Sequence, residues 1–153
     1  FDVQDYLQWL TGLTGYTYRL PSESEWEYVT RASTQTVYWW GDAIGVDKAI
    51  CRGCGKRFKG NETTPVGSFS PNAFGLYDVH GNVYEWTADC WNGSYAGAPT
   101  DGSAWISGDC GLRVLRGGSW GKSPENRRSV RRIRDEPSLR SGKRGFRVAV
   151  TLP

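Results

Sequence analysis

The chain has 153 residues and a mass of 17.1 kDa, which is the size of one domain with its own buried core. Eight Trp and an aromatic content of 14% exclude an intrinsically disordered chain, because such chains bury too little apolar surface to fold. No apolar run reaches the roughly 18 residues that a transmembrane helix needs, and residues 1–20 lack the pattern of a signal peptide. We therefore expect a folded domain without a membrane span, compatible with a bacterial cytoplasm or cell surface.

The net charge of +3 is unevenly distributed along the chain. Residues 112–153 hold twelve Lys and Arg against three acidic residues, whereas residues 1–111 hold seven against thirteen. A basic stripe can bind nucleic acid or another polyanion. Arginines in a loop-rich segment also hold the backbone by hydrogen-bonding to carbonyls and carboxylates. We favour this structural role, because Glu125, Asp135 and Glu136 interrupt the stripe.

In chain order, apolar residues at helical spacing predict a first helix over residues 1–13, which Gly15 ends. Ser22 and Glu25 form the pattern of a capping box and predict a second helix over residues 22–32. Beyond residue 33 short apolar patches alternate with Gly, Pro, Asn and Asp, which predicts loops with short strands at Val66–Phe69, Arg113–Arg116 and Gly145–Thr151. The pattern indicates a loop-rich α+β fold with two helices and few short strands.

The four cysteines fall into two pairs. Cys90 and Cys110 flank a stretch of Gly, Ser, Ala and Pro, and a disulfide closing this loop would stabilise the fold by about 3 kcal/mol by restricting the unfolded chain. We favour that disulfide. Cys51 and Cys54 form a CxxC motif, for which a redox pair, half of a zinc site and a second disulfide all remain open.

Four segments in order carry a family resemblance: Tyr18–Tyr28, Asn72–Trp86, Arg116–Trp120 and Gly145–Val148. Together they resemble the formylglycine-generating enzyme (sulfatase-modifying factor) family. The resemblance implies that residues 1–153 form a single domain with the C-type-lectin-like fold of that family. It also places the first strands of the family domain before residue 1.

The resemblance also bears on catalysis. The family's oxidase binds copper through two cysteines, five residues apart, that follow its Gly-Gly-Ser-aromatic motif, because activation of oxygen there needs soft thiolate ligands. Matching Gly117–Trp120 to this motif puts Lys122 and Arg127 at the two cysteine positions. Related iron-dependent enzymes of the same fold use three histidines, whereas this chain has only His80, which we interpret as a loop residue. We expect no catalytic residue and neither copper nor iron.

One calcium loop of the family maps onto Asp78 and Glu85 as carboxylate ligands and onto the backbone carbonyls of Gly81 and Val83. Hard oxygen ligands suit Ca²⁺, so the resemblance implies a structural calcium ion. The alternative is that both carboxylates cap turns or pair with arginines. In the family's other calcium loop, residues 56–59 are basic or apolar where a carboxylate is needed, and we expect no second ion.

Residues 121–144 match the segment that lines the concave, active-site face of the family. This chain is similar to the variable proteins of diversity-generating retroelements, in which that segment varies to bind different targets. We therefore predict a non-catalytic domain that binds a protein or another macromolecule. An oxidoreductase of the family acting on a protein cysteine is the alternative, and polyanion or nucleic-acid binding ranks last.

Within this segment and beyond it, we expect a structural role for Arg128, Ser129, Arg132, Arg140 and Arg147. The residues expected to face solvent or ligand are Gly121, Lys122, Ser123, Glu125, Arg127, Arg131, Ile133, Asp135, Ser138, Leu139, Ser141 and Lys143.

Overall fold

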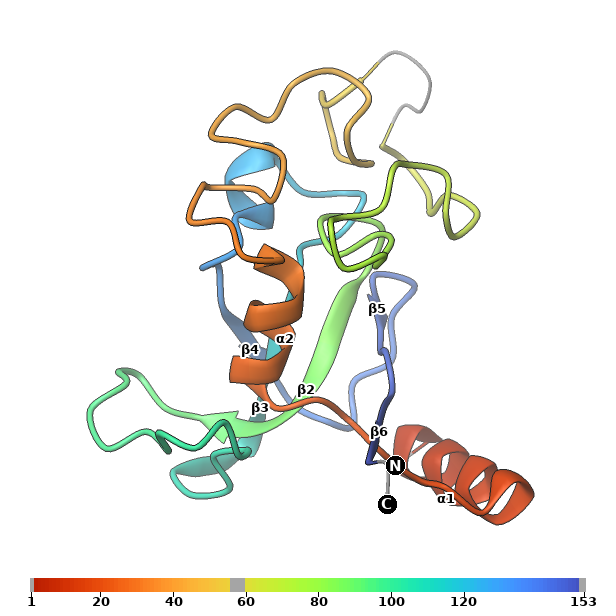
Figure 1. The fold of residues 1–153 in the computed structure, drawn as a ribbon, viewed down its shortest axis with the longest axis vertical. Coiled ribbons are helices and arrows are strands. Elements are labelled where there is room, and N and C mark those ends of the chain that lie inside the picture. Colours follow the sequence, from red (N-terminus) through yellow and green to blue (C-terminus); the bar gives the residue numbers. More distant parts are fainter. Residues whose placement is uncertain (1, 56–59, 152–153) are drawn as a thin grey trace.

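The computed structural model describes residues 2–55 and 60–151 and contains both predicted helices (Figure 1). Helix α1 spans Asp2–Thr14 and helix α2 spans Glu23–Arg31. Phe1, with which the first helix was expected to begin, lies outside the described residues. No helix in the described part of the chain is long and apolar enough to cross a membrane.

The predicted capping box starts α2. The Ser22 hydroxyl accepts a hydrogen bond from the Glu25 amide at 3.0 Å, and the Glu25 carboxylate accepts one from the Ser22 amide at 2.8 Å. The helix ends at Ala32, which adopts the left-handed conformation that stops a helix. Local sequence chemistry therefore determines the start of α2, whereas its end places an alanine in a conformation that glycine usually adopts.

The strands form two sheets among the described residues. In the larger sheet the order is β4-β3-β2-β5, with only β2 and β5 parallel, and the strands span Tyr84–Trp91 (β2), Asp109–Arg116 (β3), Ile133–Asp135 (β4) and Arg144–Gly145 (β5). A second, antiparallel pair consists of β1 (Thr17–Arg19) and β6 (Ala149–Thr151). The arrangement is the expected loop-rich α+β fold.

The strand predictions were partly wrong. Arg113–Arg116 is confirmed as the end of β3, but Val66–Phe69 forms a turn in which Gly67 has a φ of +75° and Val66 is 86% exposed. The expected strand over 145–151 is divided into β5 and β6, because its two halves pair with different strands. Strand β2 was not predicted, although polar and apolar residues alternate along Tyr84–Cys90, because its first residues were interpreted as part of a calcium loop.

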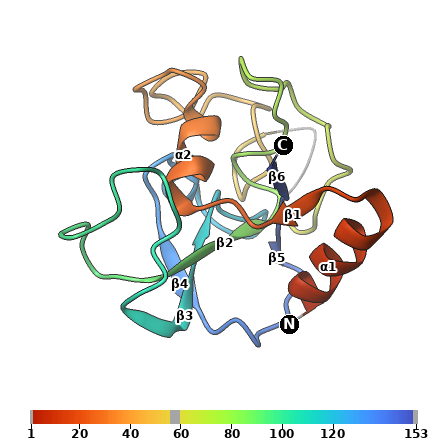
Figure 2. The ribbon, with the colours of Figure 1, turned by 60° about the horizontal axis from the view of Figure 1, so that its bottom comes forward.

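Successive residues of β2 face opposite sides of the sheet, and a different helix covers each side (Figure 2). Trp86 packs with Leu7 of α1 and with Leu115 of β3 in the apolar core. On the other side, the Glu85 carboxylate accepts a hydrogen bond from Trp26 Nε1 of α2 at 2.6 Å. The α1 side is therefore apolar, whereas the α2 side carries buried charge.

The predicted disulfide between Cys90 and Cys110 is confirmed, with Cα atoms 4.5 Å apart. It joins the end of β2 to the start of β3 and closes the irregular segment between them. The bridge lies at a place where the sheet register is interrupted on both sides of Cys90. The disulfide therefore fixes β2 to β3 at a point where their regular backbone pairing is interrupted.

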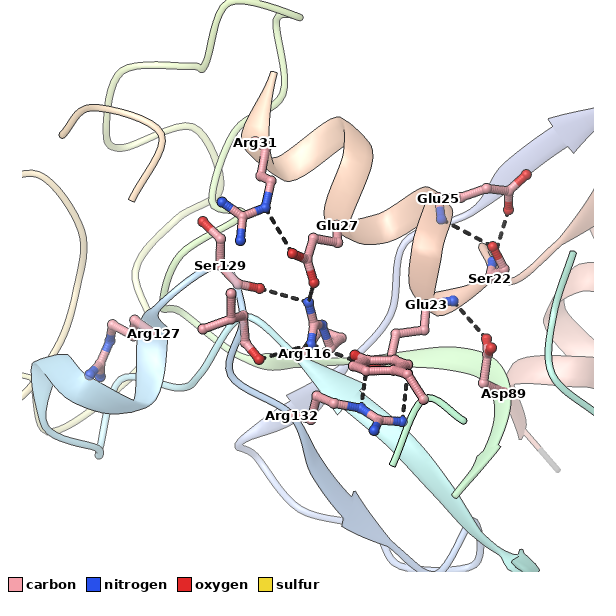
Figure 3. A network of polar contacts seen from close by, with 12 residues as sticks. Ser22, Glu23, Glu25, Glu27, Arg31, Asp89, Arg116, Arg127, Ser129 and Arg132 are labelled. Carbon is pink, nitrogen blue, oxygen red and sulfur yellow. Dashed lines mark hydrogen bonds and ion pairs between the residues drawn. The ribbon is translucent and has the colours of Figure 1, made fainter. Parts of the chain in front are cut away.

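Buried ion pairs connect α2 to the chain that follows β3 (Figure 3). Glu23, in the first turn of α2, has a side chain only 6% exposed. Its carboxylate accepts hydrogen bonds from Arg132 Nε at 2.7 Å, from Arg132 Nη2 at 2.8 Å and from Arg116 Nη1 at 3.1 Å. One carboxylate thus binds two guanidinium groups from distant parts of the chain.

Arg116, the last residue of β3, extends these contacts to the irregular backbone. Its Nη2 atom donates to the Ser129 carbonyl at 2.6 Å and also pairs with Glu27, and its Nη1 atom donates to the Val130 carbonyl at 3.3 Å. Carbonyls outside a ladder need such partners when they are buried. We call the connected side chains the arginine cluster: Glu23, Glu27, Arg31, Arg116 and Arg132.

Replacing Glu23 by alanine should destabilise the fold by about 3–5 kcal/mol, because two buried guanidinium groups would lose their shared carboxylate. Urea denaturation measures this loss. Glu25→Ala is the matched control in the same helical turn: its partner Arg19 is partly exposed, and we expect a loss of about 1 kcal/mol from the weakened cap. Equal losses in the two variants would contradict a central role for the arginine cluster.

Candidate functional site

Arg127 lies at the end of the short 3-10 helix η1 (Pro124–Arg127) and is fully buried. Its guanidinium donates to three backbone carbonyls: Nε to Ile50 at 3.1 Å, Nη1 to Ser123 at 2.5 Å, and Nη2 to Ser119. The expectation that Arg127 faces solvent or ligand was therefore wrong. The side chain instead joins the backbone at Ile50 to the backbone at Ser119 and Ser123, and both segments lie outside the strand ladders.

Burial lowers the pKa of Arg127 to about 10, so the guanidinium is still charged at neutral pH. No carboxylate pairs with it among the described residues, and the carbonyl dipoles carry the compensation. The resemblance matched this position to the family's second cysteine. A guanidinium whose three nitrogen atoms each donate to a carbonyl therefore occupies the position at which the family's oxidase has a copper-binding thiolate.

Lys122, at the first matched cysteine position, is exposed. Its amide donates to the Ser119 carbonyl and its carbonyl accepts from the Arg52 amide, both at 3.1 Å. The backbone of Lys122 is thus anchored while its side chain is free of these contacts. This combination suits a surface position whose side chain can change without loss of the fold.

The other expected ligand residues fall into two exposed groups, connected by Lys143. We name the first the η1 patch and the second the loop patch. Lys143 lies over the Trp120 ring at 4.8 Å and beside Gly121. The η1 patch consists of Lys122, Ser123, Glu125 and Arg131, and the loop patch, between β4 and β5, consists of Ser138, Leu139 and Ser141.

Two further expected ligand residues are less accessible than predicted. Ile133 lies opposite Leu115 in the β3–β4 pair and packs against the apolar core. Asp135 forms an ion pair with Arg144, and both side chains are 23% exposed. Both residues belong to β4, and its pairing with β3 packs their side chains against neighbouring residues. The polar composition of the segment gave no sign of this strand.

The expected structural residues are confirmed for three positions and wrong for two. Ser129 is buried and donates to Val37, Arg132 belongs to the arginine cluster, and Arg147 pairs with Glu85. Arg128 is exposed and donates only to the nearby Glu125 carbonyl among the described contacts. Arg140 has an 81% exposed side chain, and its partner Asp2 is exposed as well.

Cys51 and Cys54 are paired with each other, which fits both a second disulfide and the oxidised form of a redox pair. Both side chains are almost completely buried, and their Cα atoms are 5.1 Å apart. The motif lies against η1, because Arg127 bonds to Ile50 and the Arg52 amide bonds to Lys122. In this arrangement the two sulfur atoms are buried beneath the surface and are not directly accessible to a protein substrate.

His80 is buried within an aromatic cluster. Its Nε2 atom accepts a hydrogen bond from the Trp39 amide at 3.3 Å, so Nδ1 carries the proton and donates to the Arg127 carbonyl at 2.6 Å. Burial lowers the pKa of His80 to about 4, and the ring is neutral at pH 7. Both ring nitrogens are occupied, which agrees with a structural loop residue.

The expected calcium ligands lie near one another in the chain but have other partners. The two Glu85 oxygens accept hydrogen bonds from Arg147 Nε at 2.6 Å and Arg147 Nη2 at 2.5 Å, and Trp26 Nε1 also donates to one of them. Asp78 accepts from the Gly67 amide at 2.8 Å, and burial raises the pKa of its carboxyl group. These contacts match the alternative interpretation, in which Glu85 pairs with an arginine and Asp78 caps a turn.

Gly81, whose carbonyl was expected to bind calcium, has a φ of +92° and donates from its amide to the Gly117 carbonyl at 2.8 Å. Val83, two residues later, is half-buried. Among the described residues, no group of three or more His, Cys, Asp or Glu is arranged to hold a metal. Residues 56–59 of the second family calcium loop lie outside the described residues.

Sequence reasoning gave pairing of Glu85 with an arginine only as an alternative, and it missed both the contact of Glu85 with Trp26 and the role of Glu23 as the centre of the arginine cluster. The acidic residues at 23 and 27 are one helical turn apart and thus share a face of α2. That spacing was a usable signal, but Arg116 and Arg132, which pair with these acids, are more than 80 residues away in the chain.

Replacing Arg127 by alanine should lower the free energy of unfolding by about 3 kcal/mol or more, because three buried carbonyls would lose their donor. Lys122→Ala is the matched control and should leave the urea midpoint unchanged within error. The pair of denaturation curves separates a structural residue from a surface residue. An Arg127→Ala variant as stable as the wild type would overturn the structural assignment.

The calcium prediction can be measured directly. Because Arg147 already neutralises Glu85, we expect that addition of CaCl₂ in place of EDTA leaves the melting temperature unchanged. Arg147→Gln serves as a comparison, since it frees the Glu85 oxygens. A saturable rise in the wild-type melting temperature that Glu85→Gln removes would instead establish a calcium ion at this loop.

The chain is similar to known proteins over most of its length. The sulfatase-modifying factor enzyme 1-like domain matches residues 1–152. Serine/threonine-protein kinase pkn1 of Chlamydia caviae is 35% identical over 145 residues, which cover 90% of this chain and 22% of the kinase. Inactive C-alpha-formylglycine-generating enzyme 2 of Bos taurus is 34% identical, over 86% of this chain and 43% of its own. The chain thus spans less than half the length of these relatives.

Two solved structures share the fold at substantial identity. PvdO from Pseudomonas aeruginosa has a TM-score of 0.82 and 45% identity, covering 99% of this chain and 59% of that one. Variable protein 1 of Treponema denticola has a TM-score of 0.72 and 32% identity, covering 87% of this chain and 47% of that one. With a match over nearly its whole length, the chain belongs to the sulfatase-modifying factor enzyme 1-like family and has the C-type-lectin-like fold of the formylglycine-generating enzymes.

Proposed function

We propose that this chain is a non-catalytic recognition domain that binds a protein or another macromolecule through the η1 patch, the loop patch and Lys143. The observation that carries the proposal is the state of Arg127. A fully buried guanidinium, bound by three backbone carbonyls, occupies the position matched to the second copper-binding cysteine. Neither Arg127 nor Lys122 supplies a thiolate, which the family's oxidative chemistry requires.

The composition of the exposed residues supports recognition. The η1 patch combines Lys122, Glu125 and Arg131 with a small polar residue, and the loop patch adds the exposed apolar side chain of Leu139. Charges of both signs beside apolar groups suit a protein partner better than a uniform polyanion, which would favour a purely basic surface. The backbone around the η1 patch is held from beneath by buried Arg116 and Arg127, so its exposed side chains are free to vary.

The relatives supply independent support. The family includes a protein named as an inactive formylglycine-generating enzyme, and a chain named as a variable protein has the same fold. These two similarities favour a target-binding domain of the kind found in diversity-generating retroelements. An oxidoreductase acting on a protein cysteine remains the alternative, although its one cysteine pair near the site, Cys51 and Cys54, is buried and bonded.

The catalytic half of the proposal is tested by mixing the protein with a copper(I) salt, a cysteine-containing peptide and air. We expect no oxygen consumption above the protein-free rate and no peptide mass change that corresponds to an aldehyde. Formation of the aldehyde would sink the proposal.

The binding half is tested by selecting a phage-displayed random peptide library on the wild-type chain. Peptides that are enriched should lose binding to a Lys122→Glu/Arg131→Glu variant, whose melting temperature should stay within a few degrees of the wild type. Arg134→Glu, an exposed arginine over the Trp91 ring and outside both patches, is the matched control and should retain binding. Selected peptides that bind all three chains equally would contradict the assigned surface.

A further inference from the structure

A groove lies between α1 and the sheet face that carries Trp86. It consists of two adjoining cavities of about 310 Å³ and about 530 Å³, which share Val3, Trp86 and Pro137 in their walls. We call it the α1 groove, and its elements can be followed in Figure 2 as α1, β2, β5 and the chain between β4 and β5. Cavities of this size accommodate small organic molecules.

The walls of the α1 groove are largely apolar. Leu20 and Trp86 contribute from the core to its inner part, and Leu139 and Phe146 line its outer part. Leu139 is 44% exposed, so part of this apolar surface is in contact with water. Covering it with an apolar molecule would be favourable, because apolar surface gains free energy when water is removed.

The charge in the α1 groove is positive. Arg140 and Arg144, in the outer part, are paired with Asp2 and Asp135. Arg113, in the inner part, is half-buried and donates from Nη1 to the Ala88 carbonyl at 2.8 Å. No carboxylate of the described residues forms an ion pair with Arg113.

Arg113 therefore lies at the floor of an apolar groove with N–H donors that make none of the described contacts. A guanidinium presents its N–H groups in a planar fork that matches the two oxygens of a carboxylate. Cross-strand from it, Asp135 is held by Arg144 and does not pair with Arg113. The chemistry complementary to this arrangement is an anionic group attached to an apolar body.

We propose that the α1 groove binds a small organic acid, with its apolar body against Trp86 and its carboxylate on Arg113. No residue of the η1 patch lines this groove. Ser138, Leu139 and Ser141 of the loop patch also line the outer part of the groove, so the macromolecular partner and the small acid share this wall. Their charged anchors differ: Lys122 and Arg131 for the macromolecular partner, and Arg113 for the small acid.

The test uses isothermal titration of the full chain with indole-3-propionate, an aromatic body with a carboxylate, and with tryptamine, which has the same ring and a positive charge. We expect saturable binding of one indole-3-propionate and none of tryptamine. Arg113→Gln should weaken the binding about tenfold or more, since a hydrogen bond to a charged group contributes about 1.5–3 kcal/mol. Arg113→Lys should retain part of the affinity.

Arg134→Gln is the matched control, because this neighbouring arginine lies over the Trp91 ring, outside the groove, and its loss should leave the affinity unchanged. Leu139→Asp provides a second variant that removes no hydrogen bond of the fold and should also weaken binding by placing a negative charge in the wall. Absence of saturable binding to the wild type, equal binding of tryptamine, or full affinity in Arg113→Gln would overturn the proposal. The Lys122→Glu/Arg131→Glu variant should bind indole-3-propionate normally, so failure here is distinguishable from failure of the proposed function.

Discussion

The buried carboxylate of Glu23 is the contact on which the rest of the structure depends. It binds guanidinium groups from the end of β3 and from the chain just before β4, and it does so from the first turn of a helix whose start is fixed by its own capping box. Buried charges are tolerated only when they are paired. Glu23 therefore ties three distant segments to one position, and the irregular backbone at Ser129 and Val130 is bound through Arg116.

The same chemistry recurs at the two places where the family resemblance suggested metals. Arg127 fills the position matched to a copper-binding cysteine, and Arg147 holds the carboxylate expected to bind calcium. In both cases a guanidinium with several directed donors connects loops that have few ladder bonds of their own. Because this support comes from beneath, exposed side chains such as Lys122 and Arg131 contribute little to the fold, which favours a surface that varies with its target.

Several features were predictable from the sequence because they depend on residues close together in the chain. The capping box of α2 needs only Ser22 and Glu25, and the disulfide was indicated by two cysteines flanking one irregular stretch. Strand β2 was missed although polar and apolar residues alternate along it, because Glu85 was interpreted as a ligand in a calcium loop rather than as a strand residue. Arg127 was misassigned because a buried and an exposed arginine look alike in a basic segment, and only the Ile50 carbonyl, far away in sequence, distinguishes them.

By itself, the sequence determined the family, the two helices, the Cys90–Cys110 bridge and the absence of thiolates at the matched copper positions, since each depends on residue identity at short or recognisable spacing. Only the tertiary structure decided which arginines are buried, that Glu85 pairs with Arg147, and that Arg113 faces an apolar groove. The physical reason is that a guanidinium's partners are set by packing between segments distant in the chain, and local sequence carries no record of which segments meet.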